Sequence, residues 1–160
     1  RRQLQEARAL IHEAILEARR LISRLHPVVL EQAGLIVAIE ALIEQHEQER
    51  SIEIAFEYDE SMPRLPNAVE LGIYRTVQEA LNNVARHSGA DRARIDLIRS
   101  EGRVQLTVQD WGCGFEPGKA SLSSYGLRGI SERARMLRGK ANVSSKPGEG
   151  TTIRVDVPGS

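Results

Sequence analysis

The sequence has little cysteine, few aromatic residues and no long hydrophobic run among its 160 residues. The single cysteine, Cys113, excludes a disulfide bond within the chain and fits a reducing compartment. No segment reaches the roughly 18 consecutive apolar residues of a membrane-spanning helix, and no signal peptide is recognisable. We therefore expect a cytoplasmic chain that makes no contact with a membrane.

The chain also lacks an excess of charge of either sign, because 22 Lys and Arg balance 22 Asp and Glu. This balance argues against a general attraction to nucleic acid or to anionic lipid. The length suits one domain with a short extension. Because the sequence opens on Arg1 without Met, we expect it to be a fragment of a longer protein.

The first segment has the apolar spacing of a coiled-coil helix. Alternating steps of three and four residues separate Leu4, Ala7, Ile11, Ala14, Ala18, Leu21 and Leu25. Pro27 then ends the helix. Such a narrow apolar stripe needs a partner to be stable, so we expect a homodimer formed through residues 1–27.

The rest of the chain alternates helical and strand patterns. Helices are predicted from Glu31 to Glu49, from a capping box formed by Asn67 and Glu70, and around 127–137; strands are predicted at 52–58, 94–99, 103–109 and on both sides of the turn PGEG. This order predicts an α+β fold, a two-layer α/β sandwich with its helices on one face. We expect residues 28–160 to form this domain.

The stretch QEALNNVARHSGA places a carboxylate, an amide and a cation along one helical face. The residues concerned are Glu79, Asn83 and either Arg86 or His87. Taken alone, such a row is more often an ordinary solvated face than a functional site. It gains meaning only from the two glycine clusters that follow it in the chain.

The first cluster, DWGCGF, places Asp110 at a strand end, before Gly112 and Gly114. Glycine at such a position commonly allows a left-handed backbone or the close approach of a ligand. The second cluster, YGLRGISERA, places Gly126 and Gly129 at a helix start, where free N–H groups favour phosphate. The P-loop pattern GxxxxGK[ST] is absent.

The order QEALNN, DWGCGF, GLRGISERA and GEGTTI resembles the N box, the two glycine boxes and the terminal GxGT element of the GHKL ATPases. More closely, RTVQEALNNVARHSGA and YGLRGISERARMLRG resemble the ATP-binding catalytic domain of sensor histidine kinases of the nitrate-sensor and DesK-like subfamily. This resemblance extends from about residue 19 to 158. It implies the GHKL histidine-kinase ATPase fold, with ATP and Mg²⁺ as cofactors.

The resemblance assigns roles to the helical row. Asn83 matches the Mg²⁺-binding asparagine, whose side-chain oxygen suits a hard cation. Glu79 matches the acidic catalytic position that orients or deprotonates the attacking group. Arg86 and His87 match positions near the phosphates, whereas Asn82 is expected on the surface.

The resemblance also assigns the glycine boxes. Asp110 matches the carboxylate that accepts a hydrogen bond from the adenine amino group, and Thr151 matches the threonine that supports it from the neighbouring strand. Gly112 and Gly114 would let the backbone approach the base. The second box supplies the remaining nucleotide-binding positions, which would hinge or end a lid over the phosphates: Gly126, Leu127 and Gly129.

The phosphoacceptor histidine of the family lies in a His-Asp pair, and no such pair occurs here. His26 lies where the first helix ends, so we interpret it as structural. His12 is not favoured either, because no second long helix follows it before Pro27. We expect the acceptor to lie outside this fragment and residues 1–27 to be the second helix of the dimerisation and phosphotransfer region.

The resemblance implies a histidine kinase of a two-component system, in which the receiver domain of a response regulator takes the phosphoryl group. The fragment could be the cytoplasmic portion of a membrane-bound sensor. Two alternatives stay open: a serine kinase of the anti-sigma-factor type, and a non-catalytic dimerisation and docking module with a vestigial nucleotide site.

Overall fold

The computed structural model describes residues 28–116 and 124–160. The coiled-coil helix expected within residues 1–27, together with His12 and His26, lies outside the described residues. None of the described helices combines the length and the apolar character needed to cross a bilayer.

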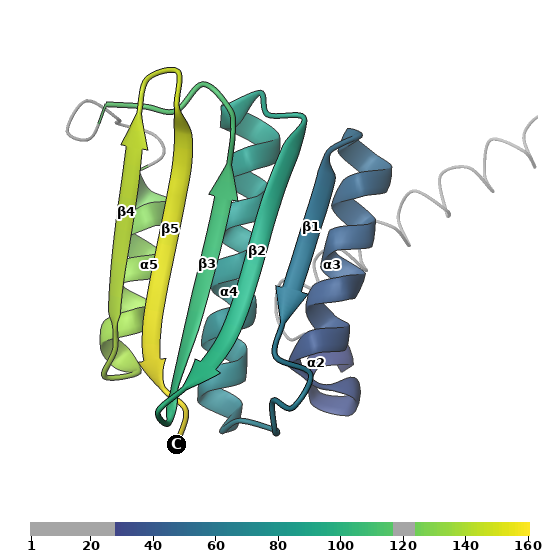
Figure 1. Cartoon of the computed structure of the whole chain (residues 1–160), viewed down its shortest axis with the longest axis vertical. Helices are drawn as coiled ribbons and strands as arrows, with labels where there is room; N and C mark the ends of the chain where they lie inside the picture. Colours follow the sequence, from purple (N-terminus) through teal and green to yellow (C-terminus); the bar gives the residue numbers. More distant parts are fainter. Residues whose placement is uncertain (1–27, 117–123) are drawn as a thin grey trace, which may run out of the picture.

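The described residues form one sheet covered by helices. The elements in chain order are α2 (Val28–Ala33), α3 (Leu35–Arg50), β1 (Glu53–Tyr58), α4 (Asn67–Asn83), the π-helical turn η1 (Val84–Ser88), β2 (Arg92–Ser100), β3 (Arg103–Asp110), α5 (Ser124–Met136), β4 (Lys140–Lys146) and β5 (Gly150–Pro158). The strand order is β1-β2-β3-β5-β4 (Figure 1). Only the pair β1 and β2 is parallel.

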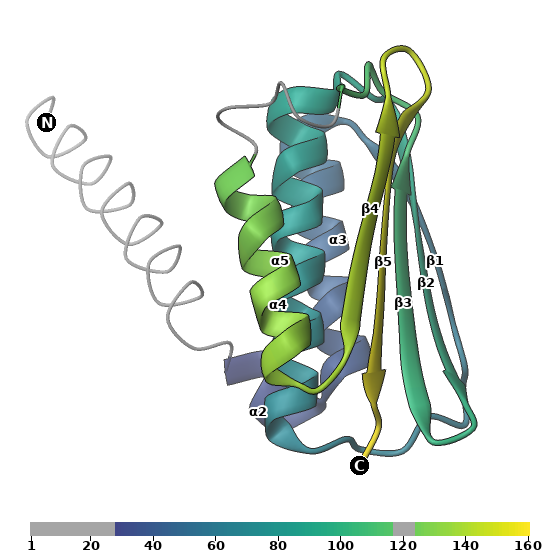
Figure 2. The same ribbon diagram turned by 90° about the vertical axis from the view of Figure 1, so that its left-hand side faces the viewer.

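All the described helices lie on one side of the sheet, and its other face is open to solvent (Figure 2). The predicted two-layer α+β sandwich is therefore confirmed. The core lies between the layers, where Ile73, Val77 and Leu81 of α4 are almost fully buried. Apolar residues at alternate positions of the strands, such as Ile95 and Leu106, face them from the sheet.

Two local predictions about helix ends are wrong. The helix expected from Glu31 to Glu49 is divided into α2 and α3 at Gly34, whose φ of 90° belongs to no helix. The capping box at Asn67 does not form, because Pro66 holds the N-cap position and no side chain caps the helix. The Glu70 carboxylate instead accepts hydrogen bonds from Arg64 (2.9 Å) and the Leu65 backbone (3.0 Å).

The end of α4 carries the first functional motif. After Asn83 the helix widens into η1, a π-helical turn of a kind often found at functional sites. The Ser88 hydroxyl ends this turn by donating to the Val84 carbonyl (2.9 Å). Across from it, Asp110 at the end of β3 pairs in register with Thr151 of β5. The motifs around residues 83 and 110 thus face each other across the two layers.

Candidate functional site

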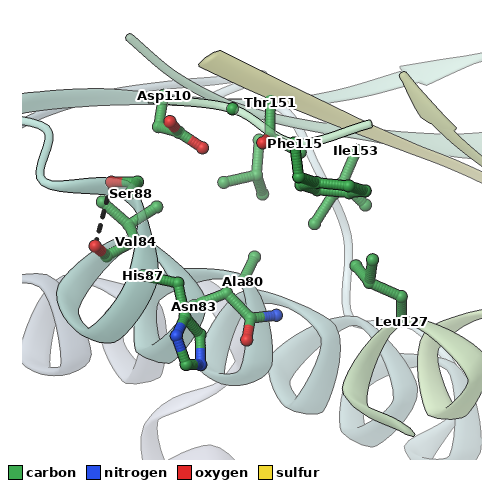
Figure 3. A pocket seen from close by; sticks show the side chains of 12 residues that line it. Ala80, Asn83, Val84, His87, Ser88, Asp110, Phe115, Leu127, Thr151 and Ile153 are labelled. Atoms are coloured by element: carbon green, nitrogen blue, oxygen red, sulfur yellow. Dashed lines mark hydrogen bonds between the residues drawn. The ribbon is translucent and has the colours of Figure 1, made fainter. Parts of the chain in front are cut away.

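An apolar cavity of about 230 Å³ lies between α4, η1 and the ends of β3 and β5 (Figure 3). Its lining comprises Ala80, Asn83, Val84, His87, Ser88, Val108, Asp110, Gly114, Phe115, Leu127, Thr151 and Ile153. In Figure 3 the sheet residues lie on one side, the α4 and η1 residues face them, and Leu127 closes one end. This layered apolar lining suits a flat ring system.

Asp110 is the one carboxylate among the described residues that line this cavity, and only 6% of its surface is exposed. Burial raises the pKa of Asp110, while hydrogen bonds from the Gly112 and Thr151 backbones lower it. The Gly112 N–H donates to Oδ1 of Asp110 over 2.9 Å. A buried carboxylate with unused acceptor capacity beside an apolar cavity is suited to receive a hydrogen bond from a ligand amino group.

The loop after β3 lies so close to its neighbours that two of its residues have to be glycine. A Cβ on Gly112 would clash with the Ser88 carbonyl oxygen, and one on Gly114, where φ is 59°, would clash with the Lys146 carbonyl oxygen. The Cys113 N–H also donates to the Ser88 carbonyl (2.7 Å). The main chain of this loop is therefore fixed against both η1 and the end of β4.

Thr151 belongs to a small hydrogen-bond network centred on the Ser145 hydroxyl. Its hydroxyl lies 3.1 Å from the Ser145 hydroxyl, which donates to the Gly150 carbonyl and accepts from the Phe115 N–H, each over 2.9 Å. This network joins β4, β5 and the glycine loop. It places the Phe115 ring in the cavity lining (Figure 3).

A polar cavity of about 410 Å³ shares Asn83 and His87 with the apolar one. Its lining comprises Arg75, Gln78, Glu79, Asn82, Asn83, Arg86, His87 and Gly126. Cationic and amide groups dominate this lining, which suits an anion. The two cavities are thus lined by chemically different groups and meet at Asn83 and His87.

The side chain of Asn83 has a buried amide nitrogen without a hydrogen-bond partner in the described part of the structure. A buried amide group left unpaired costs stability, so such a group commonly has a binding role. The amide offers an oxygen to a hard cation and an N–H to a phosphate oxygen. Among residues 28–116 and 124–160, no group of three His, Cys, Asp or Glu side chains could hold a metal ion.

The residues proposed from the sequence fall into three groups. Asn83, His87, Asp110, Gly114, Leu127 and Thr151 line the apolar cavity. Glu79, Asn83, Arg86, His87 and Gly126 line the polar cavity. Gly112 and Gly129 line neither: Gly112 acts through its backbone N–H, and Gly129 lies within α5 beside the guanidinium of Arg133.

The structure adds lining residues that the sequence analysis missed. Asn82, expected on the surface, lines the polar cavity together with Arg75. Arg75 lies one helical turn before Glu79, so the spacing of four residues could have revealed it. Phe115 was not predicted, because its position depends on the contact between the glycine loop and β4.

One family model matches residues 68–160, more than half of the chain; it describes the "Histidine kinase-, DNA gyrase B-, and HSP90-like ATPase" family. The sensor histidine kinase LiaS of Bacillus subtilis (strain 168) is 39% identical over 146 residues, which are 91% of this chain and 40% of LiaS. The oxygen sensor histidine kinase NreB of Staphylococcus carnosus (strain TM300) is 32% identical over 143 residues, 89% of this chain and 41% of NreB. The chain thus spans about two fifths of the length of these relatives.

Solved structures share the fold. The histidine kinase domain of the blue-light activated kinase of Erythrobacter litoralis EL346 superposes with a TM-score of 0.60 at 25% identity, covering 79% of this chain and 60% of that one. Full-length ShkA in complex with AMPPNP gives a TM-score of 0.64 at 20% identity, with 78% and 29% covered. This second likeness shows the fold alone.

Proposed function

The chain belongs to the histidine kinase-, DNA gyrase B- and HSP90-like ATPase family, and from this premise we propose that it is the ATP-binding catalytic domain of a two-component sensor histidine kinase. The observation that carries the proposal is the junction of the two cavities. A buried carboxylate in an apolar lining adjoins a space lined by cations and amides. An adenine ring suits the first chemistry, and a triphosphate suits the second.

At the adenine end, Asp110 accepts a hydrogen bond from the amino group of the base. Thr151, its register partner in β5, supports the carboxylate through a backbone hydrogen bond. Gly114 and Phe115 then form a wall of the cavity against the ring. This contact would select adenine. A base that carries a carbonyl group in place of the amino group, such as guanine, would have no hydrogen to donate to the carboxylate.

At the phosphate end, Arg86 supplies a cationic group, His87 supplies an imidazole, and Asn83 supplies the side chain that would hold a magnesium ion. Such an ion would neutralise part of the negative charge of the phosphates. Glu79 projects into the same cavity one turn before Asn83. It orients the attacking nitrogen of the acceptor histidine while the γ-phosphoryl group moves from ATP to that nitrogen and ADP is released.

We further propose that residues 1–27 contribute the second helix of a dimerisation and phosphotransfer region, and that a response-regulator receiver domain is the final acceptor. The relatives LiaS and NreB are named sensor histidine kinases, which supports this proposal. Neither described histidine suits the role of phosphoacceptor. His46 is buried in α3, 2.9 Å from the Leu42 carbonyl oxygen, and His87 lines the site itself.

The proposal is tested by calorimetric titration of the chain with ADP and with a non-hydrolysable ATP analogue, each with and without Mg²⁺. Calorimetry is preferred because Trp111 lies outside the cavity lining, with Arg92 4.7 Å from its ring centre, so its fluorescence is an indirect signal. We expect saturable binding of adenine nucleotides and none of guanine nucleotides.

The matched variants are Asp110→Asn and, at a half-buried aspartate away from both cavities, Asp59→Asn. Asp110→Asn should lower ADP affinity at least about tenfold, because a hydrogen bond to a charged group contributes about 1.5–3 kcal/mol. Asp59→Asn should leave it unchanged. Absence of nucleotide binding in a folded sample would refute the proposal and favour a docking module with a vestigial site.

A further inference from the structure

A stripe on α5 faces α4 beside the polar cavity. Gly126, Gly129 and Arg133 are spaced by three and four residues, so they lie on one side of the helix. Helices α4 and α5 pack against each other (Figure 2). Arg75 and Glu79 occupy successive turns of α4 at the same interface.

Two charged groups lie against the glycines of this stripe. A Cβ on Gly126 would clash with Oε1 of Glu79, so the carboxylate of Glu79 lies directly against the backbone of α5. The guanidinium of Arg133 lies over Gly129, with one nitrogen 3.6 Å from the position that a Cβ would take. The carboxylate of Glu79 and the guanidinium of Arg133 therefore lie against adjacent turns of α5.

The position of Arg133 beside α4 costs folding stability, because part of its guanidinium is buried. Its Nε is buried and has no hydrogen-bond partner in the described part of the structure. Burial lowers the pKa of Arg133, the negative charge of Glu79 raises it, and the charge of Arg75 lowers it. Arginine is seldom buried without an opposite charge, and Glu79 is the carboxylate that interacts with it here.

Arg133 lines neither the apolar nor the polar cavity. Its charge interacts with that of Glu79, so we expect Arg133 to act on a ligand through that carboxylate. A carboxylate attracted to a neighbouring guanidinium keeps one orientation more than a free glutamate, which samples several rotamers.

We propose that Arg133 is a positioning residue for Glu79, holding its carboxylate against α5 and away from the place where phosphates bind. This proposal rests on the proposed function, because it gives Glu79 its role at the phosphate end. Glu79 already lines the wall of the polar cavity; without Arg133 its carboxylate would be free to turn from α5 toward the bound nucleotide and repel the terminal phosphate. Nucleotides that lack this phosphate would be little affected.

The test is a double-mutant cycle of Glu79→Gln, Arg133→Met and the double variant. Affinities of the whole chain for ADP and for a non-hydrolysable ATP analogue are measured by calorimetry with Mg²⁺. We expect Arg133→Met to weaken the binding of the analogue about tenfold, or about 1.4 kcal/mol, and the binding of ADP less than about twofold. In the Glu79→Gln background, Arg133→Met should change the affinity for neither nucleotide.

Two further variants separate positioning from a structural role. Arg133→Lys keeps the positive charge and should restore most of the affinity for the analogue. Arg135→Met removes an exposed arginine of the same helix and should change neither affinity. The proposal would be overturned if Arg133→Met lowered the affinities for ADP and for the analogue equally. It would also be overturned if the loss of affinity were the same with Glu and with Gln at position 79.

Equilibrium unfolding of the same proteins keeps the proposal testable if the wild-type chain binds no nucleotide and the proposed function fails. Arg133 and Glu79 should then still be coupled in folding. The change in the unfolding equilibrium constant of the double variant should differ about fivefold from the product of the changes caused by the two single variants. If the change in the double variant equals that product, Arg133 and Glu79 do not interact, and the proposal is refuted. If Arg133→Met does not fold, Arg133→Gln replaces it in both cycles.

Discussion

The apolar and the polar cavity meet at Asn83 but are built in different ways. Backbone packed on backbone shapes the apolar cavity: a methyl group on Gly112 would meet the main chain of Ser88. Side chains shape the polar cavity: a methyl group on Gly126 would meet the carboxylate at the end of the Glu79 side chain. Close backbone contacts cannot relax without moving whole elements, whereas a side-chain end can rotate.

This difference suits the two parts of the proposed ligand. A flat base of constant shape is recognised by a fixed slot with one directed acceptor, Asp110. Phosphates that change number and charge during a reaction are better served by side chains that can adjust. We therefore expect substitutions near the base to act on the fold, and substitutions near the phosphates to act on binding.

Gly112→Ala is expected to have the largest effect. The added Cβ meets the backbone carbonyl of Ser88, which is itself bonded to the Cys113 N–H and cannot yield. We predict a loss of about 3 kcal/mol in the free energy of unfolding, at the upper end for overpacking. Urea unfolding measures it.

The control for this prediction is Gly129→Ala, whose added Cβ would make only an ordinary contact with the Arg133 side chain, 3.6 Å away. Alanine is also the better helix former by about 1 kcal/mol, so this variant should be at least as stable as the wild type. If Gly112→Ala and Gly129→Ala were equally stable, the backbone contact at Gly112 would not be more restrictive than the side-chain contact at Gly129.

Asn83→Ala tests the junction of the two cavities. Its amide is the proposed magnesium ligand, so its removal should reduce the gain in affinity that Mg²⁺ brings to ADP about tenfold, or about 1.4 kcal/mol. Affinity without Mg²⁺ should change by less than about twofold. Calorimetry at several Mg²⁺ concentrations measures both quantities.

Asn82→Ala is the matched control, since this neighbouring amide also lines the polar cavity but matches no magnesium position. It should leave the response to Mg²⁺ intact. If Asn83→Ala responds to Mg²⁺ as the wild type does, Asn83 is not the magnesium ligand.

Gly126→Ala sharpens the comparison, because it introduces a Cβ contact as close as that in Gly112→Ala. Here the obstructing atom is Oε1 of Glu79, the end of a flexible side chain. We predict a stability change of about 1 kcal/mol or less, partly offset by the helix preference of alanine. A loss as large as that of Gly112→Ala, again by urea unfolding, would show that the polar cavity is as rigid as the apolar one.

The sequence was sufficient for the features that depend on local periodicity. Spacings of two and of three to four residues between apolar positions predicted the strands and the existence of α4. The interruption at Gly34 was not foreseen, because a single glycine can also lie within a helix. The cap of α4 was missed because Arg64 and the Leu65 backbone compete for the carboxylate of Glu70.

The site shows the same division between local and long-range information. Glu79 and Asn83 lie one turn apart in α4, so helical spacing alone placed them together. The pairing of Asp110 with Thr151 requires β5 to lie beside β3, which residue patterns do not determine; the family resemblance supplied it. The contact of Glu79 with Gly126 depends on how α5 packs on α4, so neither pattern nor motif indicated it.

Asp110 and Asp59 provide the smallest expected effect, a difference in how stability depends on pH. Burial raises the pKa of Asp110 above its usual 3.8, so the folded protein favours the protonated form. Its contribution to stability is complete below about pH 4 and is lost as the pH rises through the folded pKa. Asp110→Asn carries no such charge, so it should gain stability relative to the wild type over that rise.

For Asp59 the pH dependence of stability has the opposite sign. Hydrogen bonds from the Ser61 hydroxyl (2.6 Å) and backbone N–H (2.9 Å) lower its pKa, so its contribution is present above pH 3.8 and is lost as the pH falls below it. Asp59→Asn should therefore lose stability relative to the wild type as the pH rises through 3.8. Urea unfolding of both variants from pH 3 to 7.5 measures these slopes. Slopes of the same sign would mean that burial of Asp110 does not disfavour its charge, and the apolar cavity would then lack the desolvated acceptor proposed for adenine.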